Sequence, residues 1–160
     1  MHQSAYRKDH STKTAVLSVL NSLLVKADER LVSLIALLDL SAAFDRLDHF
    51  ILLKRLEVPF GVQEAALEWF ASYLGDRCQS VLVNGIVSAP SPLVYGVPQA
   101  SLLGPVLFTL YSQPLSDLIS AHGSDFHKYA DDTELLRSAP PNEFCSVQTG
   151  IQTCIDDVLF

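Results

Sequence analysis

Three acidic residues are the strongest candidates for chemistry in this chain of 160 residues. Asp131 and Asp132 are adjacent, and Asp39 stands far upstream at the end of an apolar run. Neighbouring carboxylates repel each other and resist burial unless a partner or a metal ion compensates their charge. Oxygen ligands without a cluster of His or Cys are typical of Mg²⁺ rather than zinc. The working hypothesis is that Asp39 and Asp131 meet across a small sheet and hold divalent metal for phosphoryl transfer.

Each carboxylate also has an ordinary structural explanation. A lone Asp39 is more often a strand end or a helix cap, and an Asp-Asp pair alone is more often a turn. The combination favours the metal site, because both acidic positions end strands that we expect to be neighbours in a four-stranded sheet. Side chains alternate along a strand, so Asp131 and Asp132 cannot both face Asp39 unless the turn twists them. We therefore expect Asp131 to be the main partner of Asp39, with Asp132 as an auxiliary charge or occasional ligand.

The hydrophobic pattern predicts which elements carry these residues. Residues 31–38 are almost wholly apolar; periodicity alone allows a buried helix, but the length favours a central strand that ends at Asp39. Asn84-Gly85 between two apolar runs is a strong hairpin signal, and a second hairpin is expected to turn at Asp131-Asp132. The expected helices are 11–27, 48–56, 62–74, 101–119 and 144–160, and Pro114 should interrupt the fourth of them. The first helix is expected to bury a stripe formed by Val16, Val19, Leu20, Leu23 and Leu24. The predicted fold class is α+β, with helices packed on one face of a small antiparallel sheet.

Composition limits the possible functions. The chain is long enough for one domain with a real core, and 49% of its residues are hydrophobic. No apolar run approaches the ~18 residues of a membrane helix, and the N-terminus has no signal core, so we expect an intracellular protein, nuclear or cytoplasmic, that is not secreted. The net charge of −7 opposes nucleic-acid binding by this chain alone. Its mean hydropathy of +0.25 suggests apolar surfaces that face missing neighbours.

Three segments together resemble the palm motifs of reverse transcriptases of non-LTR retrotransposons. They are Leu37-Leu38-Asp39-Leu40-Ser41-Ala42-Ala43-Phe44-Asp45, the stretch from Gly96-Val97-Pro98-Gln99-Ala100-Ser101 to Phe108, and Tyr129-Ala130-Asp131-Asp132-Thr133. Their order and spacing make this a far stronger signal than one acidic pair. The resemblance covers nearly the whole chain, and it is greater to elements of the LINE-2 and CR1 type than to retroviral, group II intron or telomerase enzymes.

The resemblance implies roles for individual residues. Asp39, Asp131 and Asp132 would be catalytic and hold two Mg²⁺ ions. Phe44 would lie under the incoming sugar and select deoxynucleotides, whereas Gln99 and Ala100 would border the nucleotide. Arg7 resembles a finger residue that contacts the triphosphate, although a solvated Arg near a terminus explains it equally well. The implied substrates and partners are an RNA template, a DNA primer and deoxynucleoside triphosphates.

Two departures from the family pattern bear on activity. Ala100 stands where the family has Gly, and its methyl group would cost roughly 1–2 kcal/mol if the backbone there is left-handed. The chain is also expected to be a partial reverse transcriptase domain over 1–160, with residues 1–30 as a fingers remnant and connecting helix and with the thumb absent. Without a basic channel, weak nucleic-acid binding and little or no activity are expected for this chain alone.

Two other functions remain open. A folded, non-catalytic remnant that binds a protein partner through exposed apolar surfaces would retain the fold without metal or nucleotide binding. Another two-metal phosphoryl transferase, such as a nuclease, is less compatible with the segment from Gly96 to Pro105, because a nuclease needs no nucleotide-positioning loop.

Overall fold

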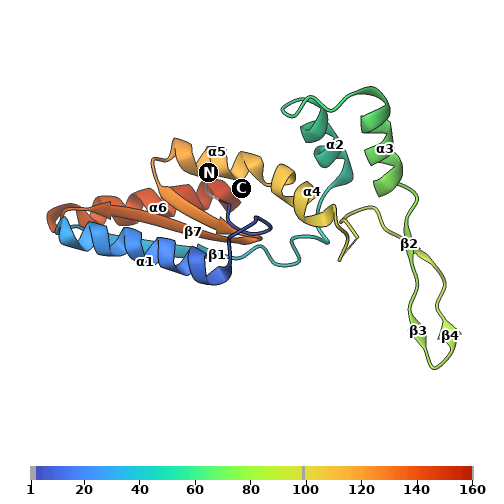
Figure 1. The fold of residues 1–160 in the computed structure, drawn as a ribbon, viewed down its shortest axis with the longest axis horizontal. Helices are drawn as coiled ribbons and strands as arrows, with labels where there is room; N and C mark the ends of the chain where they lie inside the picture. Colours follow the sequence, from blue (N-terminus) through green and yellow to red (C-terminus); the bar gives the residue numbers. More distant parts are fainter. Residues whose placement is uncertain (1–2, 99, 160) are drawn as a thin grey trace. The chain divides into compact units, whose positions relative to one another are not determined.

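The computed structural model describes residues 3–98 and 100–159, which form two compact units. The first unit comprises Met1–Ser41 and Ser112–Phe160, and the second comprises Ala42–Tyr111. The expected α+β class is confirmed: short antiparallel strands and helices alternate in nearly the predicted order (Figure 1).

An antiparallel sheet of three strands forms the centre of the first unit. Its strands are β1 (Val32–Leu38), β6 (Asp125–Tyr129) and β7 (Asp132–Ala139), arranged in the order β1-β7-β6. Helix α1 (Thr12–Asp28) lies along one face, and α5 (Gln113–Ala121) and α6 (Phe144–Leu159) lie along the other (Figure 1). Helices therefore cover both faces of the sheet rather than the single face that was expected. A short 3₁₀ turn, η1 (Pro141–Glu143), precedes α6.

The core of the first unit lies between the sheet and the α5–α6 pair. Its fully buried members are Ile119, Phe126, Leu135 and Cys154, and Ala36 and Leu38 pack against them. These strand residues alternate with others that face α1, as the period of two requires. The apolar residues of β1 are therefore divided between two faces.

Two further expectations about this sheet are wrong. Within the described residues it has three strands rather than four, because the strands of the 78–92 hairpin pair only with each other. β1 is an edge strand rather than a central one, since β7 is its neighbour in the sheet order. A continuous apolar run thus does not prove burial on both faces: Leu37 is 74% exposed.

Helix α1 begins where expected but buries different residues. Ser11 caps it, with its hydroxyl accepting from the backbone N–H of Thr14 and its own N–H donating to the Thr14 hydroxyl. Ala15 is its buried residue, and Val19 and Leu23 are half-buried. The remaining residues of the predicted stripe, Val16, Leu20 and Leu24, are exposed.

The second unit holds three helices and a long hairpin. Its elements are α2 (His49–Glu57), α3 (Glu64–Leu74), β2 (Cys78–Gln79), β3 (Leu82–Val83), β4 (Ile86–Val87), β5 (Ser91–Pro92) and α4 (Gly104–Tyr111). Asp48 caps α2 through the Ile51 N–H, and Asn84 and Gly85 both adopt positive φ between β3 and β4, as the hairpin prediction requires. The core joins α2, α3 and α4 through Leu47, Leu52, Leu56, Leu74, Val97, Leu107 and Phe108.

Proline explains the break in the helical stretch after residue 101. Pro105 is the second residue of α4, and Pro114 is the second residue of α5, with Ser112 between the two helices. Proline is tolerated in a first turn because its missing N–H would have no helical partner there. In the described part of the chain, no helix is long and apolar enough to cross a membrane.

Candidate active site

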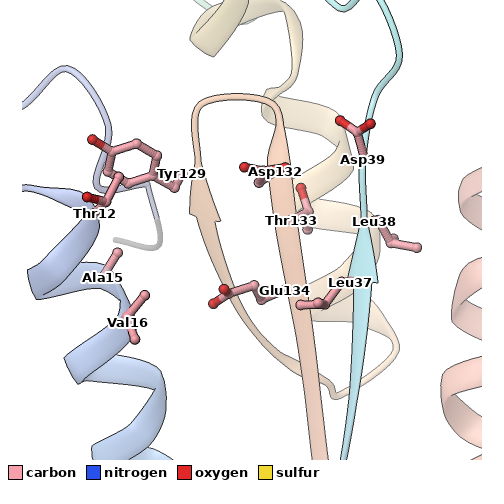
Figure 2. Close-up of a pocket in the computed structure, with 10 residues that line it drawn as sticks. All are labelled: Thr12, Ala15, Val16, Leu37, Leu38, Asp39, Tyr129, Asp132, Thr133 and Glu134. Carbon is pink, nitrogen blue, oxygen red and sulfur yellow. The ribbon is translucent and has the colours of Figure 1, made fainter.

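Asp39 and Asp132 lie at the same end of neighbouring strands. The pairing of β1 with β7 ends at Leu38 opposite Thr133, so the next residues on the two strands are Asp39 and Asp132. Both carboxylates are exposed, and Figure 2 shows them at the end of the two strands where the β6–β7 turn lies. Strand pairing thus brings together two acidic residues that are 93 positions apart in sequence.

Asp131 occupies a different position, in the turn itself. The β6–β7 hairpin closes at Tyr129 opposite Asp132, which leaves Ala130 and Asp131 as a two-residue turn. Ala130 has a φ of +57°, in the left-handed region, and Asp131 is half-buried. The strand register therefore makes Asp132 the direct neighbour of Asp39, whereas alternation along a continuous strand had favoured Asp131.

A cavity of about 300 Å³ opens beside the two exposed carboxylates. One wall comes from α1, and the other comes from β1 and the β6–β7 hairpin (Figure 2). Its lining combines apolar side chains of α1 and β1 with polar ones, of which Asp132 and Thr133 lie near the turn and Glu134 lies farther along β7 (Figure 2). The lining residues are Thr12, Ala15, Val16, Leu37, Leu38, Asp39, Tyr129, Asp132, Thr133 and Glu134.

The few carboxylates at this site suit Mg²⁺, which needs few protein ligands, better than a metal that protein side chains must surround completely. Among residues 3–98 and 100–159, no group of three or more His, Cys, Asp or Glu side chains is close enough to enclose a metal ion. Mg²⁺ usually keeps several waters and binds through one or two carboxylates together with substrate phosphates. Asp39 and Asp132 can supply such a pair, and Asp131 is adjacent in the turn.

The N-terminal segment holds the turn from the other side. The Gln3 side chain forms hydrogen bonds with both the N–H and the C=O of Ala130, each at 3.1 Å. The Ser4 N–H donates to the Lys128 carbonyl at 2.9 Å, and the Ser4 hydroxyl lies 2.8 Å from His127 Nε2. Sequence reasoning missed Gln3, because nothing local to residue 3 points to a partner 127 positions away.

Tyr6 and Arg7 follow on the same segment. Partial burial, followed by the negative charge of Asp131, raises the pKa of Tyr6. Arg7 is exposed, and its guanidinium donates to the Gln3 carbonyl at 3.3 Å. Arg7 and the acidic turn belong to the same unit. Contact of Arg7 with a triphosphate stays a prediction.

Lys128 is buried behind the turn, with only 4% of its surface exposed. Its ammonium group donates to the Ser112 carbonyl, the Ser112 hydroxyl and the Ser116 hydroxyl, at 3.2, 3.0 and 3.4 Å. Burial lowers the pKa of Lys128 to about 8, although Asp117 acts in the opposite direction. The cation is held by oxygen atoms of Ser112, which precedes α5, and of Ser116 in its first turn, which is a second feature that sequence reasoning missed.

Inside the second unit, the end of the first motif contacts the start of the second motif. The Val97 N–H donates to the Phe44 carbonyl at 3.0 Å, and the Gly96 N–H donates to the Leu47 carbonyl at 2.8 Å. The Phe44 ring packs on Phe108 of α4 with ring centroids 5.0 Å apart. Phe44 is half-buried, so part of its surface faces outward. This partial exposure is compatible with both packing and a role beside a sugar.

The loop before α4 contains the substituted position. Gln99 lies outside the described residues. Ala100 has a φ of +58°, so its backbone is left-handed and its methyl group carries the expected energetic cost. The Ser101 hydroxyl accepts from the Gly104 N–H at 2.9 Å and caps the start of α4.

Comparison with known proteins assigns the family. Residues 1–158 match the family described as reverse transcriptase (RNA-dependent DNA polymerase). The chain belongs to the reverse transcriptase family. Among curated reverse transcriptases, it is 32% identical over 143 residues to the probable RNA-directed DNA polymerase from transposon BS of Drosophila melanogaster. It is 29% identical over 159 residues to the RNA-directed DNA polymerase from mobile element jockey of the same species.

These relatives are much longer than the matched reverse transcriptase region. The alignments cover 86% and 96% of this chain but only 16% and 17% of the two relatives. Among solved structures, a chain of a partial Cas6-RT-Cas1–Cas2 complex is similar over 82% of this chain and 21% of its own length, with 22% identity and a TM-score of 0.39. The expected reverse transcriptase domain of the non-LTR type is confirmed by the sequence relatives.

Proposed function

We propose that this chain is the palm part of a non-LTR reverse transcriptase of the LINE-2 or CR1 type, and that Asp39, Asp131 and Asp132 form its nucleotidyl-transfer site. The observation that carries the proposal is the β1–β7 register, which brings Asp39 and Asp132 together at the mouth of one cavity beside the turn that carries Asp131. The whole protein would copy an RNA template into DNA from a primer 3′-hydroxyl, using deoxynucleoside triphosphates.

Mg²⁺ would be held by Asp39 and Asp132, with Asp131 as a further ligand from the turn. Bound there, the metal supplies Lewis-acid stabilisation of charge on the reacting oxygens. The protein's own contribution is to keep exposed carboxylates close together despite their repulsion, because strand pairing and the hairpin turn fix their positions. The resemblance to the family suggests that Phe44, Gln99 and Ala100 would border the nucleotide and that Arg7 would contact the triphosphate.

Metal binding by the isolated chain tests the carboxylate site. We expect Mg²⁺, or Mn²⁺ as its spectroscopic substitute, to bind with a Kd on the order of 1 mM, typical of a site with few protein ligands. Asp39→Asn or Asp132→Asn should weaken binding about tenfold or more, because each removes a charged ligand. Asp156→Asn, an exposed change on α6, is the matched control. Equal Mn²⁺ affinity in all four proteins would contradict the site.

Primer extension tests the activity of the chain by itself. We expect no measurable extension of a primed RNA template with Mg²⁺, either in the wild type or in Asp39→Ala, because the net charge of −7 does not provide a basic channel. Robust extension that disappears in Asp39→Ala would contradict this expectation and show that the chain polymerises unaided.

A non-catalytic, protein-binding remnant is the second candidate, and the exposed side of α1 favours it. Val16, Leu17, Leu20 and Leu24 are all exposed there, and Leu37 of β1 is exposed as well. A chain that binds no Mg²⁺ and no nucleotide, but purifies with a protein partner, would support this candidate over the polymerase.

A further inference from the structure

Gln3 forms a paired contact with the backbone of the acidic turn. Its Oε1 accepts from the Ala130 N–H at 3.1 Å, and its Nε2 donates to the Ala130 carbonyl at 3.1 Å. The same Oε1 accepts from the Ala5 N–H at 3.0 Å. Gln3 is only 8% exposed, so these three bonds replace hydration that the amide has lost.

The backbone around Gln3 is itself registered on β6. Gln3 forms a parallel bridge with Lys128, and the Ser4 N–H donates to the Lys128 carbonyl at 2.9 Å. The Ser4 hydroxyl lies 2.8 Å from His127 Nε2. The backbone of Gln3 is therefore held in place by β6 while its side-chain amide contacts Ala130.

The turn needs such support for two physical reasons. Ala130 is in the left-handed region, which costs a residue with a Cβ roughly 1–2 kcal/mol. Asp131 and Asp132 follow directly, and their like charges favour any rearrangement that separates them. The buried Gln3 amide bonds both the N–H and the C=O of Ala130. These bonds oppose relaxation of the left-handed backbone and separation of the two carboxylates.

We propose that Gln3 is a positioning residue that fixes the turn carrying Asp131 and Asp132 in the conformation needed to bind divalent metal. Gln3 does not touch the metal; it acts through Ala130. The metal-binding part of this inference rests on the proposed function, whereas the fixing of the turn does not.

Three variants of the isolated chain separate this role from general stabilisation. Gln3→Met keeps the length of the side chain and removes both hydrogen bonds to Ala130. Gln3→Glu keeps an acceptor for the Ala130 N–H but replaces the donor with a carboxylate oxygen that repels the Ala130 carbonyl. Gln152→Met makes the same change as Gln3→Met at an exposed position on α6 and serves as the control.

Amide hydrogen exchange and Mn²⁺ titration provide the two readouts. We expect Ala130 to exchange about tenfold or more faster in Gln3→Met, because its N–H loses its acceptor. The exchange rate should be intermediate in Gln3→Glu, which retains an acceptor but repels the Ala130 carbonyl, and near wild type in Gln152→Met. The amide of Leu135, in the middle of β7, should be unchanged in all three. Mn²⁺ affinity should fall about tenfold in Gln3→Met, the usual effect of removing a group that orients metal ligands.

Unchanged exchange at Ala130 in Gln3→Met would overturn the inference. Faster exchange with wild-type Mn²⁺ affinity would also overturn it, since Gln3 would then be only a structural contact. If the wild type itself binds no Mn²⁺, the proposed function fails, while selective exchange at Ala130 would still support the fixing of the turn. Should Gln3→Met not fold, Gln3→Asn, whose side chain is one methylene shorter, gives the same comparison.

Discussion

Three alanines adopt the left-handed conformation, one in each of the three motifs. Ala42, Ala100 and Ala130 have φ values of +56°, +58° and +57°. Residues with a Cβ are uncommon in this region, and strained backbone tends to be kept at functional sites where surrounding contacts enforce it. At Ala130 the enforcing contact is the Gln3 side chain, which bonds both of its backbone groups.

Ala100→Gly should stabilise the second unit. Glycine relieves roughly 1–2 kcal/mol of left-handed strain but raises the entropy of the unfolded chain, so we expect a net gain of about 0.5–1 kcal/mol. Ala71→Gly, at an exposed position inside helix α3, should instead destabilise by about 1 kcal/mol. Urea unfolding measures both, and shifts of the same sign would show that Ala100 carries no strain.

Lys128 should make stability depend on pH above neutrality. Its ammonium loses a proton near pH 8 when folded and near 10.5 when unfolded, so the unfolded chain binds the extra proton between these values. The free energy of unfolding should therefore rise with pH in this window, by about 2–3 kcal/mol from pH 7 to 10 relative to Lys128→Met.

The control for Lys128 is Lys13→Met, which removes an exposed lysine from α1. Its free energy of unfolding should remain parallel to that of the wild type from pH 7 to 10, measured by urea titration at each pH. A Lys128→Met chain that also stays parallel to the wild type would show that the lysine is not perturbed.

At the scale of elements, Gly96 allows the first and second motifs to approach each other. Its φ is +80°, and a Cβ at this position would lie 2.9 Å from both the Cα and the carbonyl oxygen of Asp45. Its carbonyl also accepts from Arg77 at 3.2 Å and lies 2.7 Å from His49 Nε2. The segment around Phe44 and the start of the loop before α4 are therefore held together by backbone contact.

Gly96→Ala should destabilise the second unit by about 3 kcal/mol, because left-handed strain is added to a clash with fixed backbone. Gly61→Ala is the matched control: Gly61 also has positive φ, but a Cβ there would meet nothing within 4 Å, so only the strain of about 1–2 kcal/mol should appear. Chemical denaturation compares the two. Equal losses would mean that the close approach at Gly96 has no energetic consequence.

At the scale of the whole molecule, charge governs what the chain can bind unaided. Lys and Arg number 11 against 18 Asp and Glu. We expect a primed RNA template to bind with a Kd weaker than about 100 µM at 0.15 M salt, the weak end of non-specific binding. Fluorescence anisotropy with labelled template measures this affinity. Micromolar binding with a steep salt dependence would contradict it and reveal a basic surface that the totals conceal.

Local signals in the sequence predicted most of the elements. The helix starts near residues 11 and 48, the Asn84-Gly85 turn and the break at Pro114 all depend on signals within a few residues, so each can be recognised without the fold. The motif pattern also predicted the family correctly, because three segments in order constrain identity more than any one of them. Burial was predicted less well: most of the expected stripe of α1 is exposed, since which side of a helix is covered depends on its neighbours.

The sequence by itself determined the candidate carboxylates, the hairpin that carries two of them and the strand that ends at the third. Only the tertiary structure decided that β1 lies at the sheet edge beside β7, which places Asp132 next to Asp39 and leaves Asp131 in the turn. It alone revealed that Gln3 bonds Ala130 and that Lys128 is buried against α5. The physical reason is that strand register and burial arise from contacts between distant segments, and no local pattern encodes a partner that lies 127 residues away.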